Sequence, residues 1–145
     1  MRFLFSLKIG WAFAIYALID ILCAGLGMGV PFFCIVLGLP VGWVIVRRLD
    51  PHLLSTREML RKVLNGAALT AAFTFLLMAT IWLSSLLMFR DPGMNLANYG
   101  MPLILFDPLP SFIGWLVLMI IISPFLQFLL TLFGAHLTWW RSLVD

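Results

Sequence analysis

The sequence predicts an all-α integral membrane protein with four transmembrane helices, and three observations lead to this fold class. The first is composition: of 145 residues, 63% are hydrophobic and only 10% are charged, whereas soluble domains carry about 25% charged residues. The second is the mean hydropathy of +1.12, which leaves too little polar surface to cover a globule in water. The third is the placement of the basic residues, which gather at the ends of the apolar segments.

The apolar residues fall into four segments of about the length that a membrane requires. A helix needs about 20 residues to cross a hydrocarbon core of about 30 Å. The predicted spans are residues 3–23, 30–46, 67–89 and 112–137. The fourth is long enough that it must tilt, kink or protrude, and Pro124 near its middle predicts a kink. We expect a single membrane domain over residues 1–145, because no linker divides the chain.

The basic residues predict how the chain is threaded through the membrane. Eight of the nine lie at the N-terminus, between the second and third spans, or at the C-terminus, and only Arg90 falls in another connection. The positive-inside rule then places both termini in the cytoplasm. We therefore expect an N-in/C-in multi-pass protein of a bacterial inner (plasma) membrane. Because the basic residues follow the topology, we expect no nucleic-acid partner.

The two longer connections have different characters. The cytoplasmic connection contains a predicted short basic amphipathic helix at about residues 56–65, which Ser55 and Glu58 begin as a capping box. Its basic side chains are expected to bind anionic lipid or, alternatively, an acidic partner: Arg47, Arg48, Arg57, Arg61 and Lys62. The outer loop, at about residues 90–111, is apolar for a loop. It is expected to pack in the membrane interface or, alternatively, to form a lid over a cavity.

Small residues indicate where helices turn and pack. The stretch GLGMG at residues 25–29 lacks the following βα unit of a dinucleotide-binding loop, and it suits a tight hairpin before Pro31. A re-entrant loop that lines a pathway is the alternative. Gly38 and Gly42 form a G-x-x-x-G pair that permits close helix approach. A second set of small residues shares a stripe on the third span and is also assigned to helix packing: Gly66, Thr70 and Thr74.

Asp20 is the only acidic residue within a predicted span. An ionisable group inside a membrane is a functional candidate by default. Its position about one turn from the outer end of its helix predicts that the carboxyl reaches the interface. Alternatively, it accepts hydrogen bonds from the hairpin glycines or from the N-terminus of the second helix. The functional alternatives are a relay for a proton or a cation and a contact with a partner subunit.

His136 is the candidate cofactor ligand. Its small neighbours Gly134 and Ala135 leave room for a haem or a chlorophyll-type pigment, and His52 is the candidate second ligand of a bis-histidine haem. Light-harvesting polypeptides place a small residue four positions before such a histidine, whereas this chain has Leu132 there. The alternative is a histidine at the membrane interface. Two cysteines, at positions 23 and 34, lack the spacing of a redox motif.

The sequence supports three hypotheses about function, none of them enzymatic. It contains no Ser/His/Asp set, carboxylate pair or HExxH motif, so we expect no catalysis. The first hypothesis is a small accessory subunit of a larger integral membrane complex, because small residues and an apolar loop suit packing against other subunits. The second is a small homo-oligomeric transporter or channel that uses Asp20. The third is an electron-transfer or light-harvesting component that uses His136. No cofactor is predicted under the first two.

Overall fold

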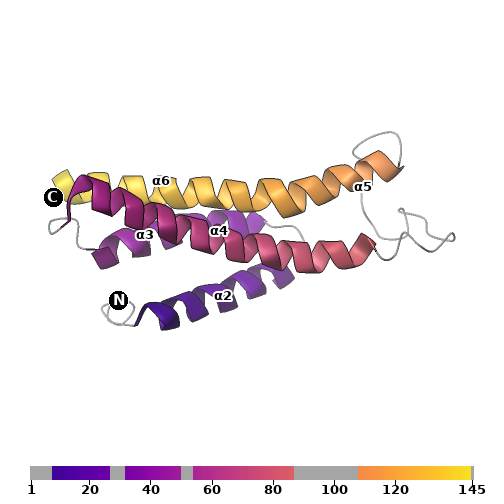
Figure 1. Cartoon of the computed structure of the whole chain (residues 1–145), viewed down its shortest axis with the longest axis horizontal. Helices are drawn as coiled ribbons and strands as arrows, with labels where there is room; N and C mark the ends of the chain where they lie inside the picture. The colour runs from indigo at the N-terminus through magenta and orange to yellow at the C-terminus, as the bar shows by residue number, and fades with distance from the viewer. Residues whose placement is uncertain (1–7, 27–31, 50–53, 87–107, 145) are drawn as a thin grey trace.

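The structure, a computed structural model, describes residues 8–26, 32–49, 54–86 and 108–144, and within these ranges it is helical and contains no strand. This result confirms the all-helical fold class. The elements are α2 (Ile9–Leu26), α3 (Phe32–Leu49), α4 (Thr56–Leu86), and a continuous rod made of α5 (Pro108–Val117), η3 (Leu118–Ile122) and α6 (Ser123–Val144). Successive helices run in opposite directions, so α3 and α6 run the same way and end near the start of α2 (Figure 1).

Three helices are long and apolar enough to cross a membrane: Phe32–Leu49, Thr56–Leu83 and Leu109–Ser142. The predicted first span corresponds to a shorter apolar helix, Ile9–Gly25, because residues 1–7 lie outside the described part of the chain. The segment Leu109–Ser142 has 34 residues, about 51 Å at 1.5 Å per residue. It therefore exceeds a hydrocarbon core of about 30 Å.

One predicted boundary is corrected by the structure. The predicted amphipathic helix leads directly into the predicted third span, and together they form one helix, α4. Within α4, Gly66 lies against the side chain of Ile45 on α3, where an added Cβ would come within 2.9 Å of Cδ1. The last helical rod begins at Pro108 rather than at residue 112, which suits a proline at the first helical position. Residues 87–107, most of the predicted outer loop, lie outside the described residues.

At the position of the kink predicted from Pro124, the structure has a π-helical turn, Leu118–Ile122. The N–H of Ser123 donates to the carbonyl oxygen of Leu118, five residues earlier, and the Ser123 hydroxyl donates to the Met119 carbonyl oxygen at 2.6 Å. A proline has no N–H, and its ring crowds the carbonyl four residues before it. The wider π turn is one of the known ways in which a helix accommodates such a position.

Helices α3 and α6 approach so closely that glycine is required where they cross. An added Cβ at Gly38 would lie 2.6 Å from the carbonyl oxygen of Gln127, and one at Gly42 would collide with the carbonyl oxygen of Thr131. From the α6 side, an added Cβ at Gly134 would lie 2.5 Å from a backbone carbonyl oxygen of α3. These neighbours are backbone atoms, so a side chain at any of the three positions requires the helices to move apart.

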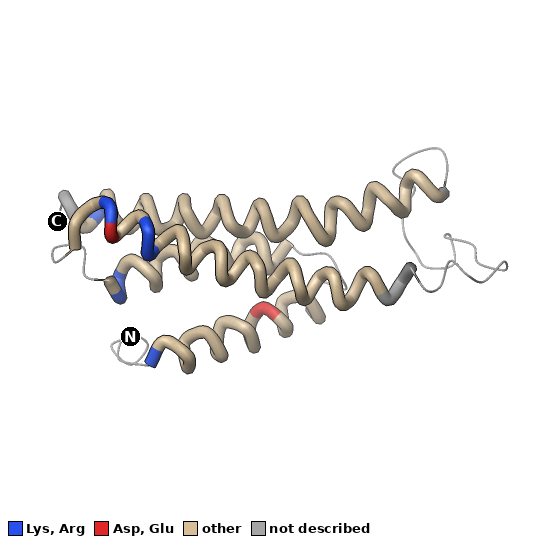
Figure 2. The backbone as a smooth tube through the Cα atoms, viewed as in Figure 1, with Lys and Arg blue, Asp and Glu red and all other residues tan. Residues whose placement is uncertain are grey.

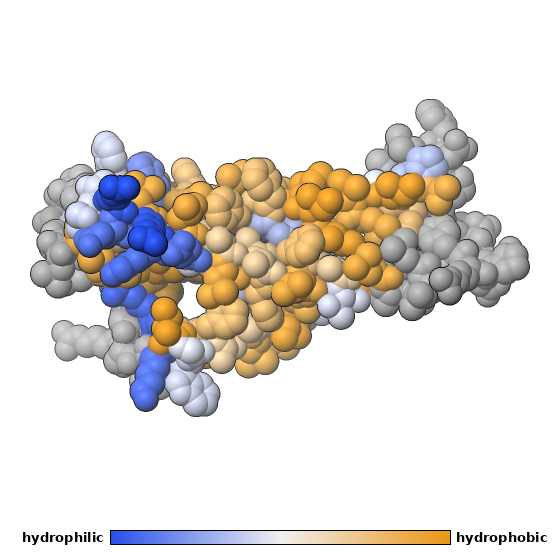
Figure 3. Space-filling view, viewed as in Figure 1, coloured by the Kyte–Doolittle hydropathy of each residue, from blue (hydrophilic) through white to orange (hydrophobic). Residues whose placement is uncertain are grey.

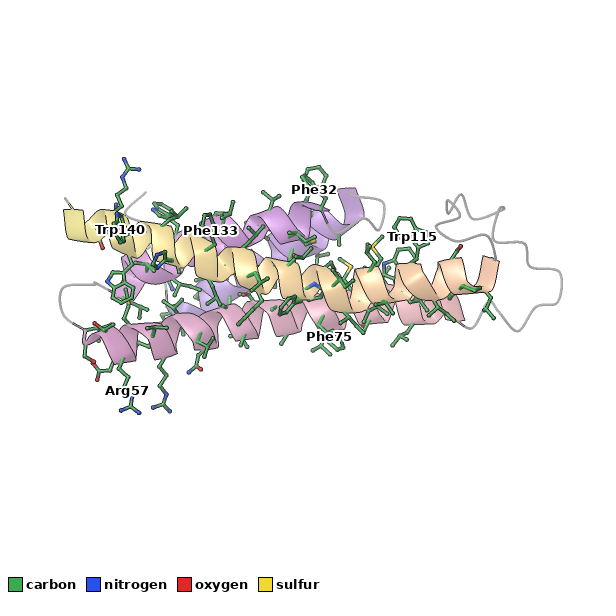
Figure 4. The ribbon with its side chains drawn as sticks, turned by 90° about the horizontal axis from the view of Figure 1, so that it is seen from above. Phe32, Arg57, Phe75, Trp115, Phe133 and Trp140 are labelled. Atoms are coloured by element: carbon green, nitrogen blue, oxygen red, sulfur yellow. The ribbon has the colours of Figure 1, made fainter. Side chains whose placement is uncertain are left out.

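All described lysines and arginines lie at one end of the bundle, which we call the basic end: Lys8, Arg47, Arg48, Arg57, Arg61, Lys62 and Arg141. Figure 2 shows these residues where α2 and α4 begin and where α3 and α6 end. The surface beyond this end is predominantly apolar (Figure 3). Trp140 lies near the basic end, and Trp115 lies toward the other end (Figure 4).

The first turn of α4 is capped by Ser55 and Glu58. The Glu58 N–H donates to the Ser55 hydroxyl oxygen at 3.4 Å, and the Ser55 hydroxyl and N–H donate to Glu58 Oε2 at 2.9 and 3.2 Å. These reciprocal bonds satisfy backbone donors that have no partner within a helix.

Substitution Ser55→Ala is expected to loosen this first turn. Loss of a serine cap costs about 1 kcal/mol, so hydrogen exchange of the amides at the start of α4 should accelerate about fivefold. The substitution Thr80→Ala serves as the control, because the Thr80 hydroxyl donates only to the Leu76 carbonyl within the same helix. Unchanged exchange at Glu58 and Met59 in the Ser55→Ala variant would contradict the assigned cap.

Candidate functional site

A layer of polar side chains lies inside the bundle between two apolar clusters. The cluster nearer the basic end comprises Val46, Met59, Val63 and Ala135. The other cluster comprises Ala24, Cys34 and Met78. Along α4 the polar residues fall between these clusters. We define the polar layer as Tyr16 and Asp20 of α2, Thr70 and Thr74 of α4, and Gln127 of α6, all buried.

Asp20 is fully buried, with 0% of its surface exposed. Its Oδ2 accepts a hydrogen bond from the Thr74 hydroxyl at 2.6 Å, and the Tyr16 hydroxyl lies 3.3 Å from the same oxygen. The expectation that this carboxyl reaches the interface is therefore wrong. The physical reason is that α2 continues for six residues beyond Asp20, to Leu26, and presents the carboxyl to α4.

A chain of hydrogen bonds joins three helices and ends on the Asp20 carboxyl. Gln127 Nε2 of α6 donates to the Tyr16 hydroxyl oxygen at 2.7 Å. The Tyr16 hydroxyl lies 2.8 Å from the Thr74 hydroxyl, which donates to Asp20. The Tyr16 hydroxyl accepts from the amide and carries one proton, which can go to the Thr74 hydroxyl, to the Thr70 carbonyl oxygen at 3.0 Å or to Asp20 Oδ2. Gln127 donates at one end of this chain, and Asp20 accepts at the other.

Two oxygen atoms of the polar layer have no hydrogen-bond partner among the described residues: Asp20 Oδ1 and Gln127 Oε1. Both groups contact the same Tyr16 hydroxyl through their other polar atom. Buried polar atoms in folded proteins are almost always satisfied, so an exception calls for a ligand, a water, an ion or a functional role. Oxygen atoms of this kind suit a proton or a hard cation.

Aromatic packing holds the central tyrosine in place. The Tyr16 ring lies 5.9 Å from the Phe13 ring and 6.0 Å from the Phe73 ring, measured between centroids. Phe13 and Phe73 also meet edge to face at 5.7 Å. Contacts of this geometry stabilise beyond the area they bury. The Tyr16 hydroxyl is therefore fixed where it can bridge Gln127 and Thr74.

Helices α3 and α4 contribute further contacts around the carboxyl. The Cys34 thiol of α3 lies 3.6 Å from the Asp20 backbone carbonyl oxygen, to which it donates. Thr70 donates its hydroxyl to carbonyl oxygens of its own helix, at Gly66 and Ala67. The Thr70 carbonyl oxygen lies 3.0 Å from the Tyr16 hydroxyl, so Thr70 contributes its backbone to the chain of hydrogen bonds and its hydroxyl does not take part. Cys23 and Cys34 are both free thiols.

The polar layer lies deep along the helices. Asp20 is the twelfth residue of α2, about 17 Å from its start at 1.5 Å per residue. Gln127 lies 14 residues before Arg141 of the basic end, about 21 Å along α6. If the basic end marks one boundary of a hydrocarbon core of about 30 Å, the layer falls inside that core.

His136 lies outside this layer. Its side chain is exposed, and its ring is 6.5 Å from the Trp140 ring. The neighbouring Gly134, expected to leave room for a cofactor, packs instead against α3. The candidate second ligand, His52, falls outside the described residues. A haem or pigment on His136 stays a prediction, which the visible absorption spectrum of the purified protein tests.

The other residues singled out from the sequence lie at three places. Gly38, Gly42 and Gly66 lie where α3 meets its neighbours. Thr70 and Thr74 belong to the polar layer. The basic residues of the cytoplasmic connection lie at the basic end. Among the described residues, no three His, Cys, Asp or Glu side chains lie close enough to hold a metal ion together.

Sequence reasoning missed the roles of Tyr16 and Gln127 in this layer. Tyr16 lies four residues before Asp20, and residues at this spacing share one helix face, so that spacing was an available signal. No comparable local signal marked Gln127, which reaches Tyr16 across 111 residues of sequence.

The fold and the site define a class of protein: a helical bundle with helices of membrane-spanning length and a buried polar layer centred on a carboxyl. Comparison of the chain with models of protein families, with curated proteins and with solved structures finds no match.

Proposed function

We propose that the chain is a small membrane transporter or channel, working as an assembly of its own copies, in which Asp20 binds a proton or a small monovalent cation. The observation that carries this proposal is the buried Asp20 carboxyl, which has one oxygen in a chain of hydrogen bonds across three helices and the other without a partner among the described residues. Ionisable groups at such depth are costly in a membrane and typically mark ion or proton pathways.

The arrangement of the helices supports this role. The Thr74 and Tyr16 hydroxyls hold the carboxyl in place between the helices, where its second oxygen can take up a proton or a cation. The π-helical turn, Leu118–Ile122, lies about one turn before Gln127, and π turns within helices often occur at functional sites. Four helices enclose little of a pathway, so several copies together would line it. The proposal involves no catalysis.

The proposed orientation places the basic end in the cytoplasm, with four spans and both termini inside. The support is the gathering of all described lysines and arginines at one end, together with the positive-inside rule. The membrane proposed is a bacterial inner membrane. Cysteines introduced one at a time at Arg57 and Ser142, in a variant with Cys23 and Cys34 replaced by alanine, are labelled in right-side-out and inverted vesicles to test this orientation.

Ion flux into vesicles tests the proposed function. The purified protein is reconstituted into phosphatidylcholine–phosphatidylglycerol vesicles, and a potassium diffusion potential, negative inside, drives cation entry. An internal pH dye reports protons, and radioactive sodium uptake reports the alternative cation. We expect one of the two fluxes to exceed that of protein-free vesicles. Fluxes equal to the protein-free level in both assays would refute the proposal.

An accessory subunit of a larger membrane complex is the second candidate function. The observation that favours it is the start of α2, where Ile9 is 85% and Trp11 is 66% exposed, as a helix from a partner would require. The particle mass after gentle detergent extraction from the native membrane separates the two candidates. A particle with other polypeptides supports a subunit, whereas a particle of this chain alone supports the homo-oligomeric transporter.

A further inference from the structure

An open groove lies between α3 and α6 at the basic end. It has a volume of about 300 Å³ and is lined by Trp43, Arg47, Leu137, Thr138 and Arg141. The groove is separate from the polar layer, because Gln127 lies 14 residues before Arg141 along α6, about 21 Å away. The proposed transport function does not use it.

The lining follows the same order on both helices. On α3 an aromatic residue, Trp43, precedes Arg47 by four positions, and on α6 an apolar residue, Leu137, precedes Arg141 by four. Residues four apart share one helix face. Helices α3 and α6 run in the same direction (Figure 1). Both arginines therefore lie at the basic end, and Trp43 and Leu137 lie about one turn deeper.

Among the residues that line the groove, the two arginines are the charged ones. Both arginine side chains are exposed, and the described residues include only two acidic ones, Asp20 and Glu58. Asp20 is buried in the polar layer, and the Glu58 carboxylate accepts hydrogen bonds from Ser55. The Thr138 hydroxyl donates to the Gly134 carbonyl oxygen at 2.7 Å, so the guanidinium groups are the donors that the groove offers to an anion.

We propose that this groove binds one anionic phospholipid, with its phosphate between Arg47 and Arg141 and an acyl chain along Trp43 and Leu137. Guanidinium groups form paired, charge-assisted hydrogen bonds with phosphate oxygens. A phospholipid presents an anion at the membrane surface and an apolar chain one step deeper, the same order as the groove. A free phosphate would contact only the arginines and would leave Trp43 and Leu137 without a partner. An acidic peptide would bind the arginines without extending along these deeper apolar residues.

The competing structural explanation is that these arginines only offset the helix dipoles. Arg47 and Arg141 both lie in the last turn of their helices, where a cation is favourable. That role affects helix stability but gives no preference among lipid headgroups. The preference for a headgroup is therefore the quantity to measure.

Native mass spectrometry of the full chain in detergent, with dioleoyl-phosphatidylglycerol or dioleoyl-phosphatidylcholine added, measures this preference. The acyl chains are identical, so only the headgroup differs. We expect wild type to retain one phosphatidylglycerol in preference to phosphatidylcholine. From the usual contribution of a basic residue near an anionic surface, phosphatidylglycerol binding should weaken about fivefold in Arg47→Gln and about thirtyfold when Arg141→Gln is added.

The matched control is the double variant Arg57→Gln and Arg61→Gln, which removes the same charge from the basic end outside the groove. It should keep most of the headgroup preference, and a loss equal to that of the groove variant would overturn the proposal. Equal retention of both lipids by wild type would overturn it as well. Glycerol phosphate is added as a competitor; displacement of the lipid at equimolar concentration would assign the groove to a soluble phosphate instead. The comparison of the two lipids and the competition with glycerol phosphate both use wild type, so they test the proposal even if a variant fails to fold.

Discussion

Substitution Gly42→Ala is expected to destabilise the protein by about 1–3 kcal/mol, the usual cost of forcing an extra methyl group into a closely packed contact. The new Cβ would collide with the Thr131 carbonyl oxygen and lie 2.6 Å from the Ala135 nitrogen. Both are backbone atoms of α6, so relief requires separation of the two helices. Thermal unfolding in detergent, followed by circular dichroism, measures the change.

Other glycines of the same chain supply graded controls for this prediction. An added Cβ at Gly25 meets nothing within 4 Å, so Gly25→Ala should be neutral or stabilising, because alanine favours a helix by up to about 1 kcal/mol. At Gly66 the nearest atom is the end of the Ile45 side chain, which can move. Gly66→Ala should therefore have an intermediate effect. Equal stability of the Gly42→Ala and Gly25→Ala variants would show that α3 and α6 do not pack this closely.

Substitution Asp20→Asn is expected to reduce ion flux in vesicles to the level of protein-free vesicles. Asparagine has nearly the same shape, and its amide oxygen can accept the bond from Thr74, so the helices should assemble as before. The asparagine amide does not bind a proton near neutral pH, and it carries no charge that could hold a cation. If the carboxyl had only a structural role, a correctly folded Asp20→Asn variant would still conduct ions.

Two variants of α4 test whether the chain of hydrogen bonds contributes to this flux. Thr74→Val removes the hydroxyl that donates to Asp20 while keeping the size of the side chain, and it should reduce the flux. Thr70→Ser keeps a hydroxyl that serves only its own helix, and it should leave the flux unchanged. Full flux in Asp20→Asn would show that the carboxyl takes no part in the mechanism. An equal loss of flux in both threonine variants would show that helix packing, and not the chain of hydrogen bonds, supports the flux.

The sequence determined the helical class and the approximate positions of the helices. Runs of apolar residues cannot be covered by the polar side chains available, and this property depends on local composition alone. The gathering of the described basic residues at one end could also be predicted, because these residues lie at the N-terminus, between the second and third spans and at the C-terminus. Boundaries were less accurate: the last helical rod begins at Pro108 rather than at residue 112, and α4 is one helix from Thr56 to Leu86.

Only the tertiary structure decided what Asp20 contacts. Composition and spacing placed this carboxyl near a helix end, but its burial depends on which face of α2 meets α4. Its partner Thr74 lies 54 residues away in sequence, and the Tyr16 that connects it to Gln127 lies 111 residues from that amide. Periodicity within one helix carries no information about the rotation and depth of its neighbours. Rotation and depth become fixed only when helices meet, as α3 and α6 do at Gly38 and Gly42, where backbone atoms of the two helices lie in contact.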